Sequence, residues 1–352
     1  MTHNYWMKRA LEIAEGGKYL ARPNPLVGAV LVSDDKVLAE GFHQQFGTAH
    51  AEPNCLNQVP KGTDLSKATL YVTLEPCSHH GKTPPCSDLL IARGVGKVVI
   101  ATQDPFGKVN GSGIERLKAH GIEVQVGVLQ QEARWQNRFF NVAHLSGRPF
   151  VALKWACSSD GFMDPKREKG TTGSIPISSA DSSTFVHHLR AQFQSIAVGK
   201  NTFFTDNPKL DVRKAAGPNP IPVVLLGNHE GKLDSELFQT SNAACLFVGN
   251  KPNLEIKNYL ESPALGSTLN QLHHKHGIIS TLVEGGRKIH DSFLNEGLWD
   301  VIYGIVSPHQ LKEGLSAPSL PQTAQLKQRT SMPSGDIIEY YINPLLHDIL
   351  AF

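Results

Sequence analysis

Short apolar segments alternate with segments of helical periodicity along the first 145 residues, and this alternation constrains the fold more than any other feature of the chain. The N-terminal segment predicts a helix with Met7, Ala10 and Ala14 on its apolar face, and two apolar runs predict a β-hairpin over 26–42. The other expected elements are a helix from 50, strand 68–74, helix 87–93, strand 97–102, helix 113–120, strand 123–129 and helix 130–145. The pattern predicts an α/β sandwich with a mixed sheet.

The pattern breaks at Ser146-Gly147-Arg148-Pro149, where glycine and proline mark the boundary expected between two domains of a 352-residue chain. We therefore predict a first domain over 1–145 and a second over 146–352. The second is again α/β, with strands expected at 150–156, 195–199, 221–227, 243–249, 280–283, 301–307 and 336–343, and helices at 180–191 and 287–296.

The charge balance gives no sign of a polyanionic partner. The chain has 34 Lys+Arg and 32 Asp+Glu, of which residues 1–145 carry 15 and 13 and the remainder 19 and 19. Because nucleic-acid binding depends on clustered basic residues, we expect no nucleic-acid partner. Charged residues interrupt the N-terminal segment and no run of 18 apolar residues occurs, so we expect no signal peptide, no membrane partner and a cytoplasmic protein.

Five cysteines, an odd number, argue against a disulfide framework and for metal binding or catalysis. Two of them belong to the sharpest pattern in the sequence: His50 and Glu52 stand two apart, Pro76-Cys77 follows strand 68–74, and Cys86 comes later. Zinc deaminases share this pattern, in which His and two thiolates hold Zn²⁺ and leave a fourth position for water. We therefore expect His50, Cys77 and Cys86 to be zinc ligands, although eight residues separate the cysteines where the common form has two.

Prolines place these residues at helix starts. Pro53 is tolerated only in the first turn of a helix, which puts His50 and Glu52 at its N-terminus. Pro84-Pro85 likewise put Cys86 at a second N-terminus, where the helix dipole favours a thiolate. Zinc lowers the pKa of a bound water to about 7, and Glu52 can pass that water's proton to a departing amine. The pattern predicts hydrolytic deamination of an amidine-like carbon, with Glu52 as the catalytic group.

The alternative interpretations are that His50, Cys77 and Cys86 form a closed structural zinc site, or that they are core residues with no metal. The first of these is the more specific. It would need a fourth protein ligand, which His79 or His80 could supply. Nothing structural requires Glu52 at its spacing, and this favours the catalytic interpretation. The remaining cysteines are expected to pack as small apolar residues: Cys55, Cys157 and Cys245.

Residues 73–86, Thr-Leu-Glu-Pro-Cys-Ser-His-His-Gly-Lys-Thr-Pro-Pro-Cys, closely resemble the deaminase domain of the bifunctional riboflavin-biosynthesis deaminase-reductases, in which the long spacer between the cysteines is usual. Residues 23–28 and 103–105 match further motifs of this family. The resemblance implies a cytidine-deaminase-like α/β/α sandwich. It also implies contacts to the pyrimidine or its phosphoribosyl group from Asn24, His79, Lys82 and Asp104, for which ordinary turn and loop residues are the alternative.

The second half extends the resemblance over nearly the full chain, through motifs at 154–161, 189–191, 198–202, 206–213 and 283–286. It implies a reductase domain with a dihydrofolate-reductase-like α/β fold. The residues implied near NADPH are Ala156, Ser178, Thr202, Asp206, Gly286, Arg287, Lys288, Ile289, His290, Asp291 and Ser292. Those implied near the substrate are Ser174, Arg190, Leu210, Arg213 and Glu284.

Physical reasoning on these residues agrees with the resemblance. Gly285 and Gly286 follow strand 280–283 and open a helix, which leaves backbone N–H groups for a cofactor phosphate. Arg190 and Arg213 offer guanidinium groups to a substrate phosphate. A tight turn and surface ion pairs are the plainer alternatives. Lys154 is a candidate substrate-binding residue that protonates the sugar oxygen, or else a surface lysine at a strand end.

The resemblance implies a two-step enzyme and a homo-oligomer. Zinc-dependent deamination of 2,5-diamino-6-(5-phosphoribosylamino)pyrimidin-4(3H)-one would precede NADPH-dependent reduction of the ribosyl group to 5-amino-6-(5-phosphoribitylamino)uracil. Pro176, where the family usually has tryptophan, and an extra charged stretch at 164–169 leave a monofunctional deaminase with a degenerate reductase domain as one alternative. A deaminase of RNA bases, disfavoured by the charge balance, and a non-catalytic module with structural zinc are the others.

Overall fold

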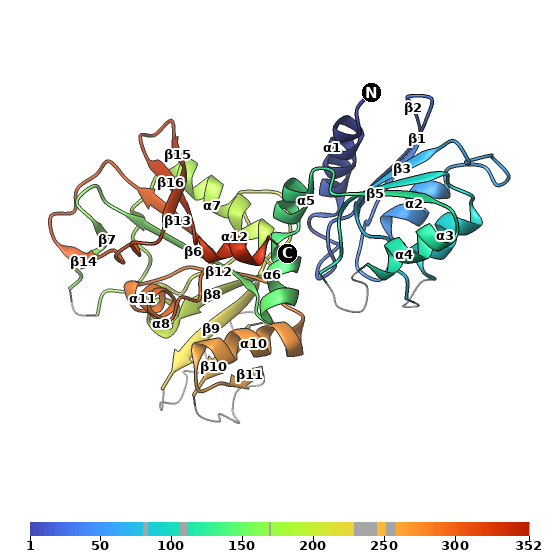
Figure 1. Cartoon of the computed structure of the whole chain (residues 1–352). Helices are drawn as coiled ribbons and strands as arrows, with labels where there is room; N and C mark the ends of the chain where they lie inside the picture. The colour runs from blue at the N-terminus through green and yellow to red at the C-terminus, as the bar shows by residue number, and fades with distance from the viewer. Residues whose placement is uncertain (80–83, 106–110, 169, 229–244, 251–257, 352) are drawn as a thin grey trace. The chain divides into compact units, whose positions relative to one another are not determined.

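The computed structural model describes residues 1–352 except 80–83, 106–110, 169, 229–244, 251–257 and 352 (Figure 1). The chain forms two compact units: Met1–Ser146 with Ile349–Phe352, and Gly147–Asp348. Each unit carries its own sheet and its own hydrophobic cores.

The first unit is built on a five-stranded sheet in the order β2-β1-β3-β4-β5. Strand β1 pairs antiparallel with both β2 and β3, whereas β3, β4 and β5 run parallel. The strands are β1 Gly28–Ser33, β2 Lys36–Phe42, β3 Thr69–Leu74, β4 Lys97–Thr102 and β5 Glu123–Val126. The predicted hairpin and the mixed sheet are therefore confirmed.

Six α-helices accompany this sheet in the described part of the unit: α1 His3–Ala14, α2 Ala51–Leu56, α3 Cys86–Ala92, α4 Ser112–Ala119, α5 Gln130–Gln136 and α6 Arg138–Ser146. The prediction of one helix over 130–145 is wrong, because Asn137 separates α5 from α6. Its side-chain amide bonds both the N–H and the C=O of Leu26, which are contacts distant in sequence.

Alternate residues of each central strand pack on opposite faces of the sheet, as strand geometry requires. On β3, Leu70 and Val72 belong to a core formed with α2, α3 and α4. Tyr71, between them, packs in a second core with α1 and α5. The first unit is thus the expected α/β/α sandwich, with helices on both faces of the sheet (Figure 1).

The second unit contains a nine-stranded sheet in the order β11-β10-β9-β8-β12-β6-β13-β16-β15, which is parallel from β11 to β13 and antiparallel beyond. In sequence order the strands are β6 Phe150–Cys157, β8 Ser195–Gly199, β9 Ile221–Gly227, β10 Leu246–Gly249, β11 Tyr259–Glu261, β12 Ser280–Val283, β13 Val301–Val306, β15 Gln325–Ser331 and β16 Ile337–Ile342. A separate two-stranded sheet pairs β7 Phe162–Pro165 with β14 Gly314–Ser316. All seven predicted strands are present, although residues 243 and 244 of one prediction lie outside the described residues.

The sequence pattern missed β15 because all seven of its residues are exposed, so no apolar alternation marks it. The described helices here are α7 Ala180–Gln192, α8 Lys200–Asp206, α10 Leu265–His276, α11 Arg287–Asn295 and α12 Leu345–Ile349, of which α7 and α11 were predicted. Helices α10 and α11 pack with Ala197 of β8, and α8 packs with the flanking Ile196 and Val198. Among the described residues, every helix is too short or too polar to span a bilayer.

Candidate active sites

Three side chains from three separate elements meet at one point of the first unit. His50 is the N-cap of α2, Cys77 follows β3, and Cys86 is the first residue of α3. The His50 Nδ1 atom lies 3.7 Å from the Cys77 sulfur and 3.3 Å from the Cys86 sulfur, and the three donor atoms all lie within 4.8 Å of one another. One imidazole nitrogen and two thiol sulfurs at this separation form a donor set that fits Zn²⁺.

Both cysteines were predicted as zinc ligands, and the hydrogen bonds around the two sulfurs differ. The backbone N–H of Cys86, at the start of α3, donates to the Cys77 sulfur over 3.3 Å. Hydrogen bonds from the Cys86 side chain and from His50 lower the pKa of the Cys77 thiol to about 4. The pKa of the Cys86 thiol is raised by its hydrogen bond to Cys77 and by burial.

Glu52 lies in the first turn of α2, two residues from His50, and only 3 % of it is exposed. Burial and then the nearby Cys77 raise the pKa of the Glu52 carboxyl to about 7. A carboxyl with a pKa near neutrality can both accept and return a proton, which is the property required of a general acid–base catalyst.

Among the described residues, the cluster that could hold a metal consists of His50, Cys77 and Cys86 alone. His79, one of two candidates for a fourth ligand, is exposed and is not part of it, while His80 lies outside the described residues. All five cysteines are free, and the three expected to pack as apolar residues are buried: Cys55, Cys157 and Cys245.

A cavity of about 260 Å³ opens beside the cluster. Asn24, His79 and Asp104, all expected to contact substrate, line it together with His50, Glu52 and Cys77. Lys82 lies outside the described residues. The residues predicted from the sequence thus come from four separate segments that the fold brings to one cavity.

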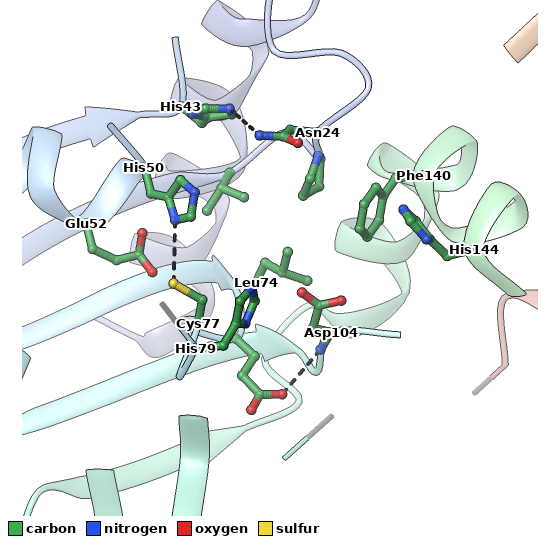
Figure 2. A pocket seen from close by; sticks show the side chains of 13 residues that line it. Asn24, His43, His50, Glu52, Leu74, Cys77, His79, Asp104, Phe140 and His144 are labelled. Atoms are coloured by element: carbon green, nitrogen blue, oxygen red, sulfur yellow. Dashed lines mark hydrogen bonds between the residues drawn. The ribbon is translucent and has the colours of Figure 1, made fainter. Parts of the chain in front are cut away.

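The cavity also has lining residues that the sequence analysis missed. The Asn24 side-chain NH₂ donates to His43 Nε2 over 3.0 Å, and His43 Nδ1 donates to the Ala49 carbonyl oxygen over 3.0 Å. Phe140 and His144 of α6, in ring contact at 4.3 Å, face the His50 side across the cavity (Figure 2). No motif marks these residues, because they reach the cavity only through tertiary packing.

A cavity of about 510 Å³ occupies the second unit. Ten of the residues expected near NADPH or its substrate line it: Lys154, Ala156, Ser174, Ser178, Arg190, Thr202, Asp206, Leu210, Glu284 and Gly286. Pro176 lies in the same wall.

Gly285 has φ +129°, and a Cβ there would come 3.0 Å from the Thr202 hydroxyl oxygen, so the backbone fits closely against α8. The sequence predicted free backbone N–H groups here for a cofactor phosphate. The Gly286 N–H is not free, because it donates to Thr202 Oγ1 over 3.1 Å.

A buried group of charges forms one wall of this cavity. Arg190 donates two hydrogen bonds to Glu284, at 2.9 and 3.0 Å, and the Lys154 ammonium lies 3.4 Å from the same carboxylate. Burial alone would raise the pKa of Glu284, but Lys154 and Arg190 together lower it to about 2. Lys154 and Arg190 are therefore partners of a buried carboxylate, not the surface cations that the plainer alternatives described.

Seven residues of the expected reductase set lie outside the cavity lining: Arg213, Arg287, Lys288, Ile289, His290, Asp291 and Ser292. Arg213 is exposed and pairs with Asp211, which corresponds to the surface ion pair of the alternative interpretation. Arg287 pairs with Asp291 on α11 over 3.1 Å, and Ile289 packs in the core. His290 is fully buried beside Trp155, with ring centroids 5.2 Å apart, and burial lowers the pKa of its imidazole to about 3.

Arg167, in the extra charged stretch, is a lining residue that the sequence analysis did not select. Its guanidinium makes two hydrogen bonds to Asp164, at 2.7 and 2.8 Å, and one to Asp206 at 3.2 Å. It also donates to the Gly173 carbonyl oxygen over 2.8 Å. The stretch is thereby tied to α8 at the edge of the cavity.

Fold and sites together define a class: a cytidine-deaminase-like domain with a zinc donor set, followed by a reductase domain. Residues 1–102 match the family model for the cytidine and deoxycytidylate deaminase zinc-binding region, and residues 149–333 match that for the RibD C-terminal domain. The riboflavin biosynthesis protein RibD of Aquifex aeolicus is 37% identical over 324 residues, which cover 90% of this chain and 89% of that protein. The RibD of Actinobacillus pleuropneumoniae is 35% identical over 366 residues, covering 97% of this chain and 96% of that protein. The chain belongs to the RibD family of bifunctional deaminase-reductases of riboflavin biosynthesis.

Solved structures agree with this assignment. The RibD structure from Acinetobacter baumannii has a TM-score of 0.86 and 32% identity, covering 97% of this chain and 98% of that one. A Thermotoga maritima structure described as a diaminohydroxyphosphoribosylaminopyrimidine deaminase/5-amino-6-(5-phosphoribosylamino)uracil reductase has a TM-score of 0.85 and 35% identity, with the same coverage. The chain is thus both a hydrolase and an oxidoreductase, and its two domains imply Zn²⁺ and NADPH as cofactors.

Proposed function

We propose that the first unit deaminates 2,5-diamino-6-(5-phosphoribosylamino)pyrimidin-4(3H)-one. The second unit then reduces the ribosyl group of the product to give 5-amino-6-(5-phosphoribitylamino)uracil. The observation that carries the proposal is the cavity of about 260 Å³ in which the His50, Cys77 and Cys86 donors lie beside the buried Glu52 carboxyl. The reaction named for the Thermotoga maritima relative supports the choice of substrate.

In the first unit, His50, Cys77 and Cys86 would hold the zinc ion, which when bound would supply a water activated for attack on carbon. Glu52 Oε would accept a proton and deliver it to the exocyclic amine, which would leave as ammonia. Asn24, bonded to His43, and Asp104 orient the pyrimidine across the cavity, while His79 lies toward the phosphoribosyl group.

In the second unit, the cavity would hold NADPH, which when bound would supply the hydride for reduction at the sugar C1′. Lys154 Nζ donates a proton to the sugar oxygen, and Glu284 fixes both Lys154 and Arg190 at the cavity wall. Arg190 then offers its positive charge to the substrate, while Thr202 and Asp206 of α8 flank the cofactor.

The substitution Glu52→Gln tests the deaminase assignment, because it keeps the shape of the side chain and removes its proton-accepting oxygen. We expect zinc content to stay at the wild-type level and the deamination kcat to fall by about 10²- to 10⁴-fold. A variant that binds zinc and deaminates at the wild-type rate would show the assignment of Glu52 to be wrong.

An assay that follows ammonia release and NADPH loss separately tests the order of the two steps. We expect NADPH oxidation to require the deaminated intermediate. Absence of oxidation with that intermediate would indicate a monofunctional deaminase with a degenerate reductase domain, the alternative suggested by Pro176 and the stretch at 164–169.

The partners and location of the protein belong to the same proposal. The near-zero net charge supports a small phosphorylated metabolite over RNA, and a salt-dependent RNA gel shift would contradict this. We also propose that the protein is a cytoplasmic homo-oligomer without a membrane partner, and light scattering measures its oligomeric state.

A further inference from the structure

Glu75, at the end of β3, is a buried carboxylate to which the proposed mechanism gives no role. Only 4 % of the residue is exposed, although it lines the deaminase cavity. Its Oε2 atom accepts hydrogen bonds from the backbone N–H groups of Asp104, at 3.3 Å, and Gly111, at 3.0 Å. Its Oε1 atom accepts from Gly113 at 2.9 Å and from Ile114 at 3.4 Å.

These four hydrogen bonds explain how a carboxylate is tolerated at this depth. A buried charge must be compensated, and here four backbone N–H donors compensate it. Two of the donors lie in the first turn of α4, an eight-residue helix whose N-terminus favours a negative charge. Hydrogen bonds to a charged acceptor are stronger than those between neutral groups.

Glu75 also links two parts of the cavity. It stands two residues before Cys77, and its Oε2 atom bonds the backbone of Asp104, whose side chain points into the cavity (Figure 2). Gly113 makes the approach close: a Cβ at this position would lie 2.0 Å from the carbonyl oxygen of Pro76, so α4 begins directly against the cysteine-bearing segment. One carboxylate therefore fixes Asp104 relative to the zinc donors.

We propose that Glu75 is a positioning residue, which holds Asp104 at the distance from the zinc cluster that the pyrimidine ring spans. The inference rests on the proposed function, in which Asp104 contacts the substrate. Because Glu75 acts through Asp104 and not on the reacting carbon, its loss should weaken substrate binding and leave the chemical step unchanged.

The substitution Glu75→Gln tests this with little change in shape. A Gln side chain has one acceptor oxygen and one NH₂ group, so it can accept from only one of the two donor pairs and presents N–H to the other. We expect the deaminase KM to rise about tenfold or more, which is the effect of losing hydrogen bonds to a charged group. We expect kcat to stay within about twofold and zinc content to be unchanged.

Glu115→Gln is the matched control, since Glu115 is an exposed acid in the same first turn of α4 and should leave KM and kcat at wild-type values. The reductase rate of each variant, measured with the deaminated substrate, reports the integrity of the second unit. If Glu75→Gln does not accumulate as a folded protein, Glu75→Asp, which retains the charge on a shorter side chain, takes its place.

A double-mutant cycle with Asp104→Asn separates the inference from the proposed function. We expect Asp104→Asn to raise KM and the double variant to be no worse than Asp104→Asn alone, because both changes remove one contact. If the two effects on KM multiply, or if Glu75→Gln lowers kcat or zinc content, the positioning role is wrong while the proposed function stands. If Asp104→Asn leaves KM unchanged, the role proposed for Asp104 fails, and the positioning role fails with it.

Discussion

The two cavities of this chain are assembled in different ways. The zinc donors lie close in sequence, with His50 27 residues from Cys77 and 36 from Cys86, and helix starts and backbone N–H groups hold the acidic residues around them. The reductase cavity instead depends on ion pairs between distant residues, since Glu284 lies 130 residues from Lys154 and 94 from Arg190. The difference is that the first site offers donor atoms to an ion, whereas the carboxylate of the second is compensated by cations of the protein itself.

Removal of zinc should give the largest difference between the activities of the two units. We expect a chelator to abolish deamination and leave the NADPH-dependent rate with the deaminated substrate within about twofold of its starting value, since metal activation of water is confined to one unit. Added Zn²⁺ should restore the lost activity. Loss of both activities on chelation would show that the reductase activity also depends on a metal.

Glu284→Gln should affect the second unit alone. Removing one partner of a buried ion pair leaves uncompensated charge, here on Lys154 and Arg190, so we expect the unit to lose about 3–5 kcal/mol of unfolding free energy. We expect the reductase kcat/KM to fall at least about 100-fold, which corresponds to the loss of hydrogen bonds to charged groups. Glu313→Gln, which changes an exposed carboxylate of the same unit, is the control. Reductase activity that survives Glu284→Gln would contradict the role of the cluster.

Acid should weaken the second unit through the same carboxylate. The pKa of Glu284 is lowered from 4.5 to about 2 in the folded protein, so its ionised form favours folding. This contribution is fully present above about pH 4.5 and is lost as the pH falls towards about 2, amounting to about 3 kcal/mol. Denaturant unfolding of the second unit between these pH values should show the loss, and the same titration of Glu284→Gln should lack it. An unchanged pH dependence in the variant would assign the acid sensitivity to other carboxylates.

Arg167→Ala should give the smallest effect. Arg167 ties Asp164 and the Gly173 carbonyl to Asp206, beside which we place NADPH. We expect the KM for NADPH to rise about three- to tenfold, as for the loss of one part-buried hydrogen-bonded contact, with deamination unchanged. Lys166→Ala removes a neighbouring exposed cation that pairs with exposed Glu313, and it should change neither constant. Equal effects of the two substitutions would show that Arg167 contributes only general charge.

The fold was predictable where burial imposes a period on the sequence. Strands β4 and β8 are continuous apolar segments because nearly all of their side chains are buried. Their bounds match the predicted ones. Strand β15 is exposed throughout and was missed, and the break between α5 and α6 depends on the contact of Asn137 with Leu26. The first error arises because an exposed strand has no apolar pattern, and the second because a contact distant in sequence ends a helix that the local pattern would continue.

The same division applies to the candidate sites. Spacing and proline placement predicted His50, Glu52, Cys77 and Cys86 as site residues. This was possible because few residue types bind zinc and because prolines indicate where helices begin. The residues implied by the resemblance have mixed outcomes: Thr202 and Asp206 line the cavity of the second unit, whereas Arg213 forms a surface ion pair.

By itself, the sequence predicted two α/β halves and which histidine and cysteines approach one another, since these follow from hydrophobic periodicity and ligand chemistry. Only the tertiary structure decided which cations pair with the buried Glu284, which cysteine sulfur accepts the N–H of Cys86, and that Glu75 receives four backbone donors. The physical reason is that burial and hydrogen-bond partners are properties of packed neighbours, and the neighbours of Glu75 and Glu284 come from segments that no local pattern connects.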